Sequence, residues 1–141
     1  MANPEHLEIL KQGVEVWNRW RRENPEEEPD LYGADLECVD LAGGNLRKTN
    51  LYRVNFTGAD LESADLRGAN LGEANLLKAF FVKADLSESN LILARLAETN
   101  FIEANLTGAR VWGVSAWGLQ LEGAIQKDLV ISHPFAEAAR T

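Results

Sequence analysis

Residues 59–78 read ADLES ADLRG ANLGE ANLLK, which is one five-residue unit repeated four times. Each unit consists of a small residue, then Asp or Asn, then Leu, then two variable residues. Further out, a large apolar residue returns at every fifth position from Leu31 to Val111 without a miss. An internal repeat this dense restricts the fold strongly, because every unit must bury the same apolar positions.

The period of five excludes both a long helix and a plain strand. Along a helix, five residues advance about 500°, so successive leucines would point to every side and leave no apolar stripe. Along an uninterrupted strand, an odd period would place alternate leucines on opposite faces. A corner in each unit would return Ala and Leu, which lie two residues apart, to the inside each time. The sequence therefore predicts a solenoid of stacked coils, with Leu and Ala inside and the other three positions outside.

The Ala-(Asp/Asn)-Leu-x-x run resembles the pentapeptide-repeat family over residues 31–123. The resemblance implies an all-β solenoid, a right-handed four-sided parallel β-helix in which four repeats make a coil of about twenty residues. Two leucines twenty positions apart, such as Leu66 and Leu86, would then be buried one above the other. The pattern departs where Asp or Asn is expected at Phe80, Arg95 and Arg110.

The segments that flank the repeats also resemble those of bacterial pentapeptide-repeat proteins. These segments are residues 13–21, GVEVWNRWR, and residues 117–123, WGLQLEG. Some relatives continue past this second segment into a signalling-type domain. The resemblance therefore leaves two alternatives open, a stand-alone repeat protein or a sensor or scaffold module of a longer signalling protein.

Residues 1–24 are predicted to form an α-helical cap on the solenoid. Asn3 is a suitable N-cap and Pro4 suits the first helical position, and an apolar stripe follows, so we expect one helix that runs to Glu23. Such a helix would cover the first coil, whose backbone and leucine column are otherwise exposed. A helix that binds a partner or a membrane is the alternative, but the acids and bases of this segment balance.

Three further segments complete the predicted organisation. Residues 25–30, PEEEPD, are predicted to be an acidic, Pro-rich linker. The repeat solenoid is predicted over residues 31–123, although its register decays after Val111. Residues 124–141 lose the repeat and are predicted to be a C-terminal tail.

Length, charge and cysteine content suggest a single acidic domain. The chain has 141 residues and a formal net charge of −8. An acidic balance argues against direct nucleic-acid binding, which needs clustered Lys and Arg. The one cysteine, Cys38, cannot form an internal disulfide, so we expect a reducing compartment, with the cytoplasm as the default. We see no signal peptide and no apolar run of spanning length, so no membrane association is expected.

No set of residues has the spacing of a catalytic or metal site. His6 and His133 are isolated in sequence and are predicted to be surface residues. The repeated Asp and Asn are predicted to form outward polar ladders, because calcium needs six to eight converging oxygens. Cys38 is predicted to point outward, with no basic neighbour to make it a thiolate. We therefore expect no enzymatic activity, no catalytic residue, no cofactor and no metal.

The function predicted from these features is that of a non-enzymatic scaffold or protein-interaction module. The rival is a DNA mimic that binds a type II topoisomerase, which the family resemblance implies for some members. The face centred on Leu41, Leu61, Phe81, Phe101 and Leu121 would carry most of the acidic charge. A single acidic face imitates duplex DNA poorly, because duplex DNA carries a charge about every 1.7 Å.

One exterior column is a candidate partner-binding surface. On the face of Leu31, Leu51, Leu71, Leu91 and Val111, the position after each central residue would stack Tyr and large apolar side chains. They can stabilise the sheet by stacking between coils, or they can form a binding patch. The partner would be an unidentified protein, and we expect a monomer or a weak homodimer. The candidate residues are Tyr32, Tyr52, Ile92, Leu93 and Trp112.

Overall fold

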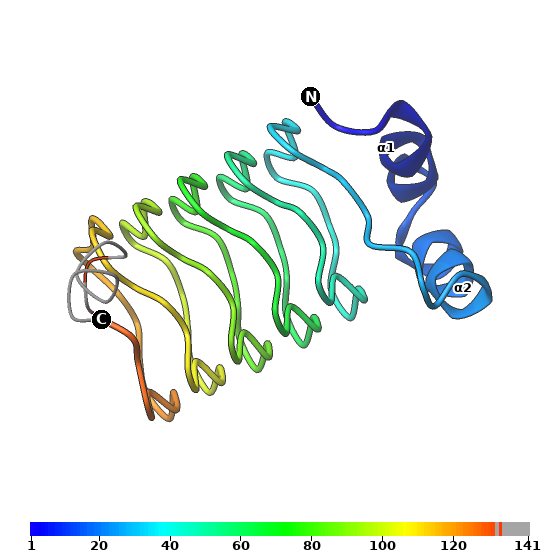
Figure 1. The fold of residues 1–141 in the computed structure, drawn as a ribbon. Coiled ribbons are helices and arrows are strands. Elements are labelled where there is room, and N and C mark those ends of the chain that lie inside the picture. The colour runs from blue at the N-terminus through cyan, green and yellow to red at the C-terminus, as the bar shows by residue number, and fades with distance from the viewer. Residues whose placement is uncertain (132, 134–141) are drawn as a thin grey trace, which may run out of the picture.

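Two short helices precede a long stack of coils in the computed structural model, which describes residues 1–131 and 133 (Figure 1). The helices are α1, Pro4–Lys11, and α2, Val14–Glu23. They lie at the N-terminal end of the stack, and the remaining described residues wind away from them (Figure 1). Within the described residues, neither helix has the length and hydropathy that crossing a bilayer requires.

The coils pair in parallel through backbone bridges between positions twenty residues apart. The first bridge joins Asp30 to Asn50 and the last joins Arg110 to Val130. The pairing consists of isolated bridges, one per repeat, so the sides of the coil are shorter than ordinary strands. The predicted solenoid is confirmed, with a coil of twenty residues. Its handedness stays a prediction.

Repeats along most of the stack end in a β-turn that makes the corner. The N–H of Ala64 donates to the carbonyl of Leu61 at 3.1 Å, and the same bond recurs along the stack. The second variable position has positive φ, as a type II turn requires. Glycines such as Gly58 (φ 65°) occupy this position, yet residues such as Lys78 (φ 59°) and Glu88 (φ 59°) occupy it as well. The corner therefore requires a left-handed backbone rather than a small side chain.

The Asp or Asn of each unit holds the turn that follows it. Oδ1 of Asp60 accepts the N–H of Glu62 at 3.0 Å, and Oδ1 of Asn90 accepts the N–H of Ile92 at 3.0 Å. This is an Asx turn, in which the side-chain oxygen accepts a backbone N–H that has no backbone carbonyl as its acceptor. Neighbouring coils are also linked, because Nδ2 of Asn90 donates to Oδ1 of Asn70 at 3.0 Å. The predicted polar ladders are confirmed at such pairs.

The interior is a continuous apolar column. Leu66 and Leu86 are both fully buried, as the twenty-residue coil predicts. The rings of Phe81 and Phe101 stack with their centroids 5.4 Å apart. The column weakens in the last coil, where Gln126 occupies a central position and is exposed. The backbone pairing nevertheless continues to residue 130, beyond the predicted limit at 123.

The prediction of one continuous N-terminal helix is wrong. The chain breaks at Gly13, whose φ of +105° lies outside the helical region, and α2 starts at the next residue. The break lets both helices pack on the first coils, burying Leu10 and Trp17. Asp30, assigned to the linker from sequence, already pairs with the second coil.

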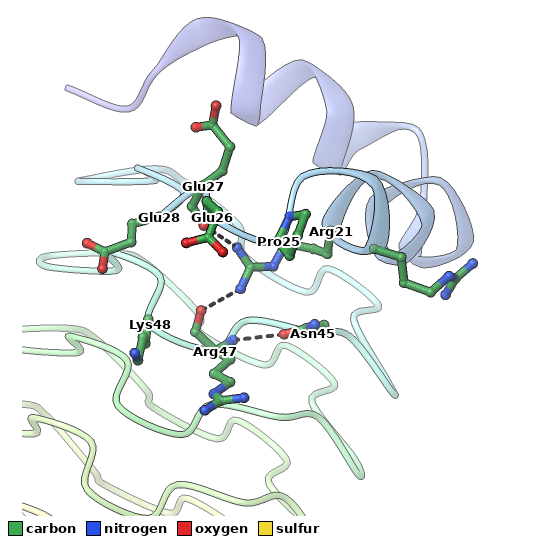
Figure 2. A pocket seen from close by; sticks show the side chains of 9 residues that line it. Arg21, Pro25, Glu26, Glu27, Glu28, Asn45, Arg47 and Lys48 are labelled. Atoms are coloured by element: carbon green, nitrogen blue, oxygen red, sulfur yellow. Dashed lines mark hydrogen bonds between the residues drawn. The ribbon is translucent and has the colours of Figure 1, made fainter.

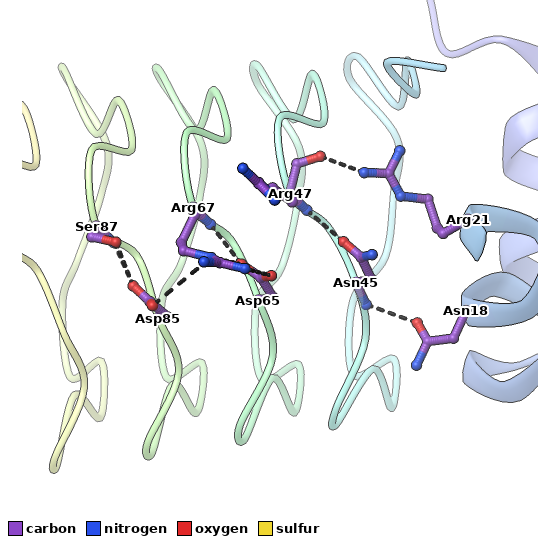
Figure 3. Close-up of polar contacts among 8 residues, drawn as sticks. All are labelled: Asn18, Arg21, Asn45, Arg47, Asp65, Arg67, Asp85 and Ser87. Carbon is purple, nitrogen blue, oxygen red and sulfur yellow. Dashed lines mark hydrogen bonds and ion pairs between the residues drawn. The ribbon is translucent and has the colours of Figure 1, made fainter. Parts of the chain in front are cut away.

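Side chains of α2 bind backbone groups at the exposed edge of the solenoid. Nε1 of Trp17 donates to the carbonyl of Asn45 at 2.7 Å. Oδ1 of Asn18 accepts the N–H of Asn45 at 2.8 Å, and Nη2 of Arg21 donates to the carbonyl of Arg47 at 2.7 Å (Figure 3). The cap therefore supplies the hydrogen bonds that another coil would otherwise make.

His6 is buried, so its assignment to the surface is wrong. Its Nδ1 accepts the N–H of Asp30 at 3.0 Å, and its ring lies 5.1 Å from that of Trp20. The N–H of Asn3 donates to the carbonyl of Asp30 at 2.9 Å. The N–H and the carbonyl of Asp30 are thus both bound, by His6 of α1 and by the N-cap Asn3, and these bonds fix the cap to the first coil.

Candidate protein-interaction surface

The predicted exterior column lies on one side of the solenoid. We call this side the aromatic face. It comprises residues 30–33, 50–53, 70–73, 90–93 and 110–113. The backbone bridges place the position after each central residue directly above its counterpart in the preceding coil. The column therefore reads Tyr32, Tyr52, Gly72, Ile92 and Trp112.

The N-terminal half of the column is a packed stack. The rings of Tyr32 and Tyr52 are stacked, with centroids 5.7 Å apart and planes 17° apart. A Cβ at Gly72 would come within 2.8 Å of the Tyr52 ring, so that ring extends over the glycine. The guanidinium of Arg53 lies 5.5 Å from the same ring centroid. Both tyrosines are half-buried, and their contacts fit a role in stabilising the sheet.

The C-terminal half has a more accessible apolar cluster, which we call the Leu93 patch: Ile92, Leu93 and Trp112. Leu93 is 45% exposed and has a φ of 61°. Twelve described residues other than Gly have positive φ, and Leu93 is the one large apolar residue among them. Ile92 and Trp112 are half-buried. A bulky apolar side chain in a strained, exposed position contributes little to the core, so the patch needs another explanation.

The edges of the Leu93 patch are formed by nearby glycine and histidine. A Cβ at Gly113 would lie 2.6 Å from Cδ2 of Leu93, so Leu93 extends across that glycine toward the next coil. The ring of His133 meets that of Trp112 edge-on, with centroids 4.3 Å apart. His133 itself is partly exposed. These neighbours leave the outer surface of Leu93 accessible.

Two arginines flank the Leu93 patch. Arg95 lines a groove of about 400 Å³ together with Leu93, and Arg110 lies two residues before Trp112. Both are exposed, and neither makes an ion pair or a side-chain hydrogen bond within the described part of the chain. Sequence reasoning identified them as departures from the repeat but did not connect them with the candidate surface.

A second cavity, of about 430 Å³, lies between the cap and the first coils (Figure 2). Its polar centre is Arg21, whose two terminal nitrogens donate to the carbonyls of Glu27 and Arg47. Burial lowers the pKa of Arg21, a tendency that Asp65 opposes and Arg47 reinforces. The guanidinium thus links α2 to the linker at Glu27 and to the coil at Arg47. We therefore regard the cavity as part of the packing between the cap and the solenoid. Acids and bases both line it: Arg21, Arg22, Glu26, Glu27, Glu28, Arg47 and Lys48.

The described residues give no geometry of a metal centre. No three His, Cys, Asp or Glu side chains among residues 1–131 and 133 are grouped so that they could hold an ion. Cys38 is exposed, at the outward position that the sequence predicts, with a φ of 56°.

Fold and surface together define a repeat solenoid with a capped N-terminal end and one apolar exterior column. The chain belongs to the pentapeptide-repeat family. The family pattern described as pentapeptide repeats matches in eight copies, over residues 34–72, 64–101, 81–115 and 89–125. No curated protein matches the chain.

Solved structures of pentapeptide-repeat proteins resemble this fold. HetL of the cyanobacterium Nostoc sp. strain PCC 7120, involved in regulating heterocyst differentiation, is 27% identical with a TM-score of 0.59, over 74% of this chain and 60% of HetL. A thylakoid-lumen protein of Arabidopsis thaliana is 26% identical with a TM-score of 0.56, over 77% and 75%. QnrB1, a plasmid-mediated fluoroquinolone resistance protein, is 18% identical with a TM-score of 0.55, over 72% and 59%, which shows the fold alone. The chain thus spans less than two thirds of the length of HetL and of QnrB1.

Proposed function

We propose that this protein is a non-enzymatic scaffold of the cytoplasm that binds a partner protein through the Leu93 patch. The observation that carries the proposal is the 45% exposure of Leu93 in a left-handed conformation, beside Ile92 and Trp112. Aromatic side chains and arginine are favoured at protein interfaces, and an exposed apolar cluster on a rigid surface is a suitable anchor. The tyrosine half of the aromatic face is assigned to the fold.

The test is affinity capture from the source cell with three proteins. The first is the wild type, and the second carries Ile92→Ser, Leu93→Ser and Trp112→Ser. The third is a matched control, Phe80→Ser, which removes another exposed apolar residue (47% exposed) from a different face. We expect mass spectrometry to identify a partner with the wild type and the control but not with the triple variant. Capture that survives the triple change, or a small-molecule turnover abolished by one point change, would overturn the proposal.

The acidic face raises the alternative of a topoisomerase-binding DNA mimic. Residues 40–43, 60–63, 80–83, 100–103 and 120–123 carry five acids and one base. Five coils at about 4.8 Å spacing span about 24 Å, over which duplex DNA would carry about 14 charges. Phe80 also interrupts the acidic column. The scaffold is therefore preferred, and we expect no inhibition of gyrase supercoiling at low micromolar protein.

A further inference from the structure

We infer that the segment bound by the Leu93 patch is an acidic peptide, with Asp or Glu on both sides of one or two large apolar residues. Leu93 and Trp112 would contact the apolar side chains, and Arg95 and Arg110 would bind the carboxylates. This inference rests on the proposed function and adds the chemistry of the partner.

The two arginines occupy unusual positions in the repeat. Each occupies the repeat position that normally holds Asp or Asn, and each borders the Leu93 patch. Arg95 shares the groove with Leu93, whereas Arg110 and Trp112 lie on the outer side of the same repeat, on either side of the inward Val111. Arginine presents a planar fork of donors that matches a carboxylate, so two such groups beside apolar residues fit an acidic, apolar segment.

Arginine brings no advantage to the turn at these two positions. Asn or Asp would accept the N–H two residues later, as Asn90 does from Ile92 at 3.0 Å. The corresponding N–H groups of Ala97 and Trp112 have no backbone or side-chain acceptor in the described part of the chain. The fold therefore gives up two local hydrogen bonds where it places two positive charges.

Several other cations of the solenoid form ion pairs, in contrast to these two arginines. Arg53, Lys78 and Lys83 each pair with a glutamate in the next coil, at 3.5, 3.7 and 3.9 Å. Among residues 1–131 and 133, no such acid pairs with Arg95 or Arg110, so their charge is available to a ligand. In the part of the chain that the structure describes, Arg47 and Lys48 also make no ion pair, but they lie on another face and therefore provide a matched control.

The experiment selects twelve-residue peptides from a random displayed library on the immobilised full chain. The peptides most enriched are then synthesised with a fluorescent label, and their dissociation constants are measured at low and high salt. The binding variant is Arg95→Asn with Arg110→Asn, which restores the repeat pattern. The control is Arg47→Asn with Lys48→Asn, which removes the same charge elsewhere.

We expect enriched peptides with net negative charge and large apolar residues. Their affinity should fall at least tenfold in the Arg95/Arg110 variant, at least tenfold in the triple serine variant, and less than threefold in the control. Binding should weaken as salt rises. The Arg95/Arg110 variant should melt at the wild-type temperature or above, so that its loss of binding cannot come from unfolding.

Several outcomes would overturn the inference. Enrichment of neutral or basic peptides would do so, as would affinity unchanged in the Arg95/Arg110 variant or lost equally in the control. Self-association blocked by the triple serine change would assign the patch to a second copy. If cellular capture depends on Leu93 but not on the arginines, the proposed function stands and only the acidic chemistry fails.

Discussion

At the scale of single residues, most repeats meet two backbone requirements that lie outside the apolar pattern. One is the positive φ at the second variable position, and the other is an acceptor for the N–H after the central residue. The acceptor is visible in the sequence as a recurring Asp or Asn, but only the structure shows that this side chain accepts the N–H two residues later. The first is hidden, because residues such as Lys78 and Leu93 adopt a conformation that glycine would adopt more easily.

Phe80→Asn should stabilise the protein, because it supplies a missing turn acceptor. The introduced amide would accept the N–H of Val82 and lie between Asp60 and Asn100 in the ladder. We expect a gain of about 0.5 to 1 kcal/mol in the free energy of unfolding, measured by urea denaturation. Phe80→Ala is the control, since it removes the ring without adding an acceptor. An equal gain in both variants would show that exposure of the ring, not the turn, limits stability.

At the scale of elements, the coil and the cap differed in how far sequence could predict them. The burial of Leu66 above Leu86 followed from the repeat, because each unit meets the same environment. The break at Gly13 had a local signal, the glycine itself, which a helical pattern on both sides obscured. The burial of His6 had no local signal, since it depends on where α1 docks against Asp30. Contacts between distant segments are what a single sequence reveals least.

Leu66→Ala should lower the free energy of unfolding by about 2 to 5 kcal/mol, because it opens a cavity in the fully buried column. Arg67→Ala, its exposed neighbour, should cause a far smaller loss, since exposed ion pairs contribute little. Denaturant melts of both variants test this difference. Losses of similar size would contradict the interior column.

The small effect of Arg67→Ala should also depend on pH. Burial opposes ionisation of Asp65, but hydrogen bonds from the side chain and backbone of Arg67 outweigh it and lower its pKa. Arg67 reaches Asp65 at 2.8 Å and Asp85 at 4.0 Å (Figure 3). A lowered carboxyl pKa stabilises the fold above its usual range, and that contribution is lost as pH falls through the lowered value. The difference between wild type and Arg67→Ala should therefore vanish in acid.

At the scale of the whole molecule, the two ends of the stack are unlike. The cap buries Trp17 and binds edge groups at the N-terminal end. At the other end, a cavity of about 150 Å³ opens among the last apolar side chains, including Leu121 and Leu129. The sequence could not locate this end, because backbone pairing continues through Gln126, where the apolar pattern has already failed. The candidate surface was predicted as a column, but its division into a packed tyrosine half and an accessible Leu93 half required side-chain contacts.

The twenty-residue ladder also sets a rule for how such a gene can lengthen. An in-frame duplication of residues 59–78 adds one whole coil, so every downstream side chain keeps its orientation to the cap. An insertion of five residues would instead turn everything downstream by one corner and move the Leu93 patch to the neighbouring side. Spin labels on Cys38 and on Gly118→Cys, four coils apart in one column, should separate by about 4.8 Å more after the duplication. Insertions of four repeats, or of a multiple of four, would thus keep the Leu93 patch on the same side of the solenoid relative to the cap. An insertion of any other number of repeats would move it to a different side.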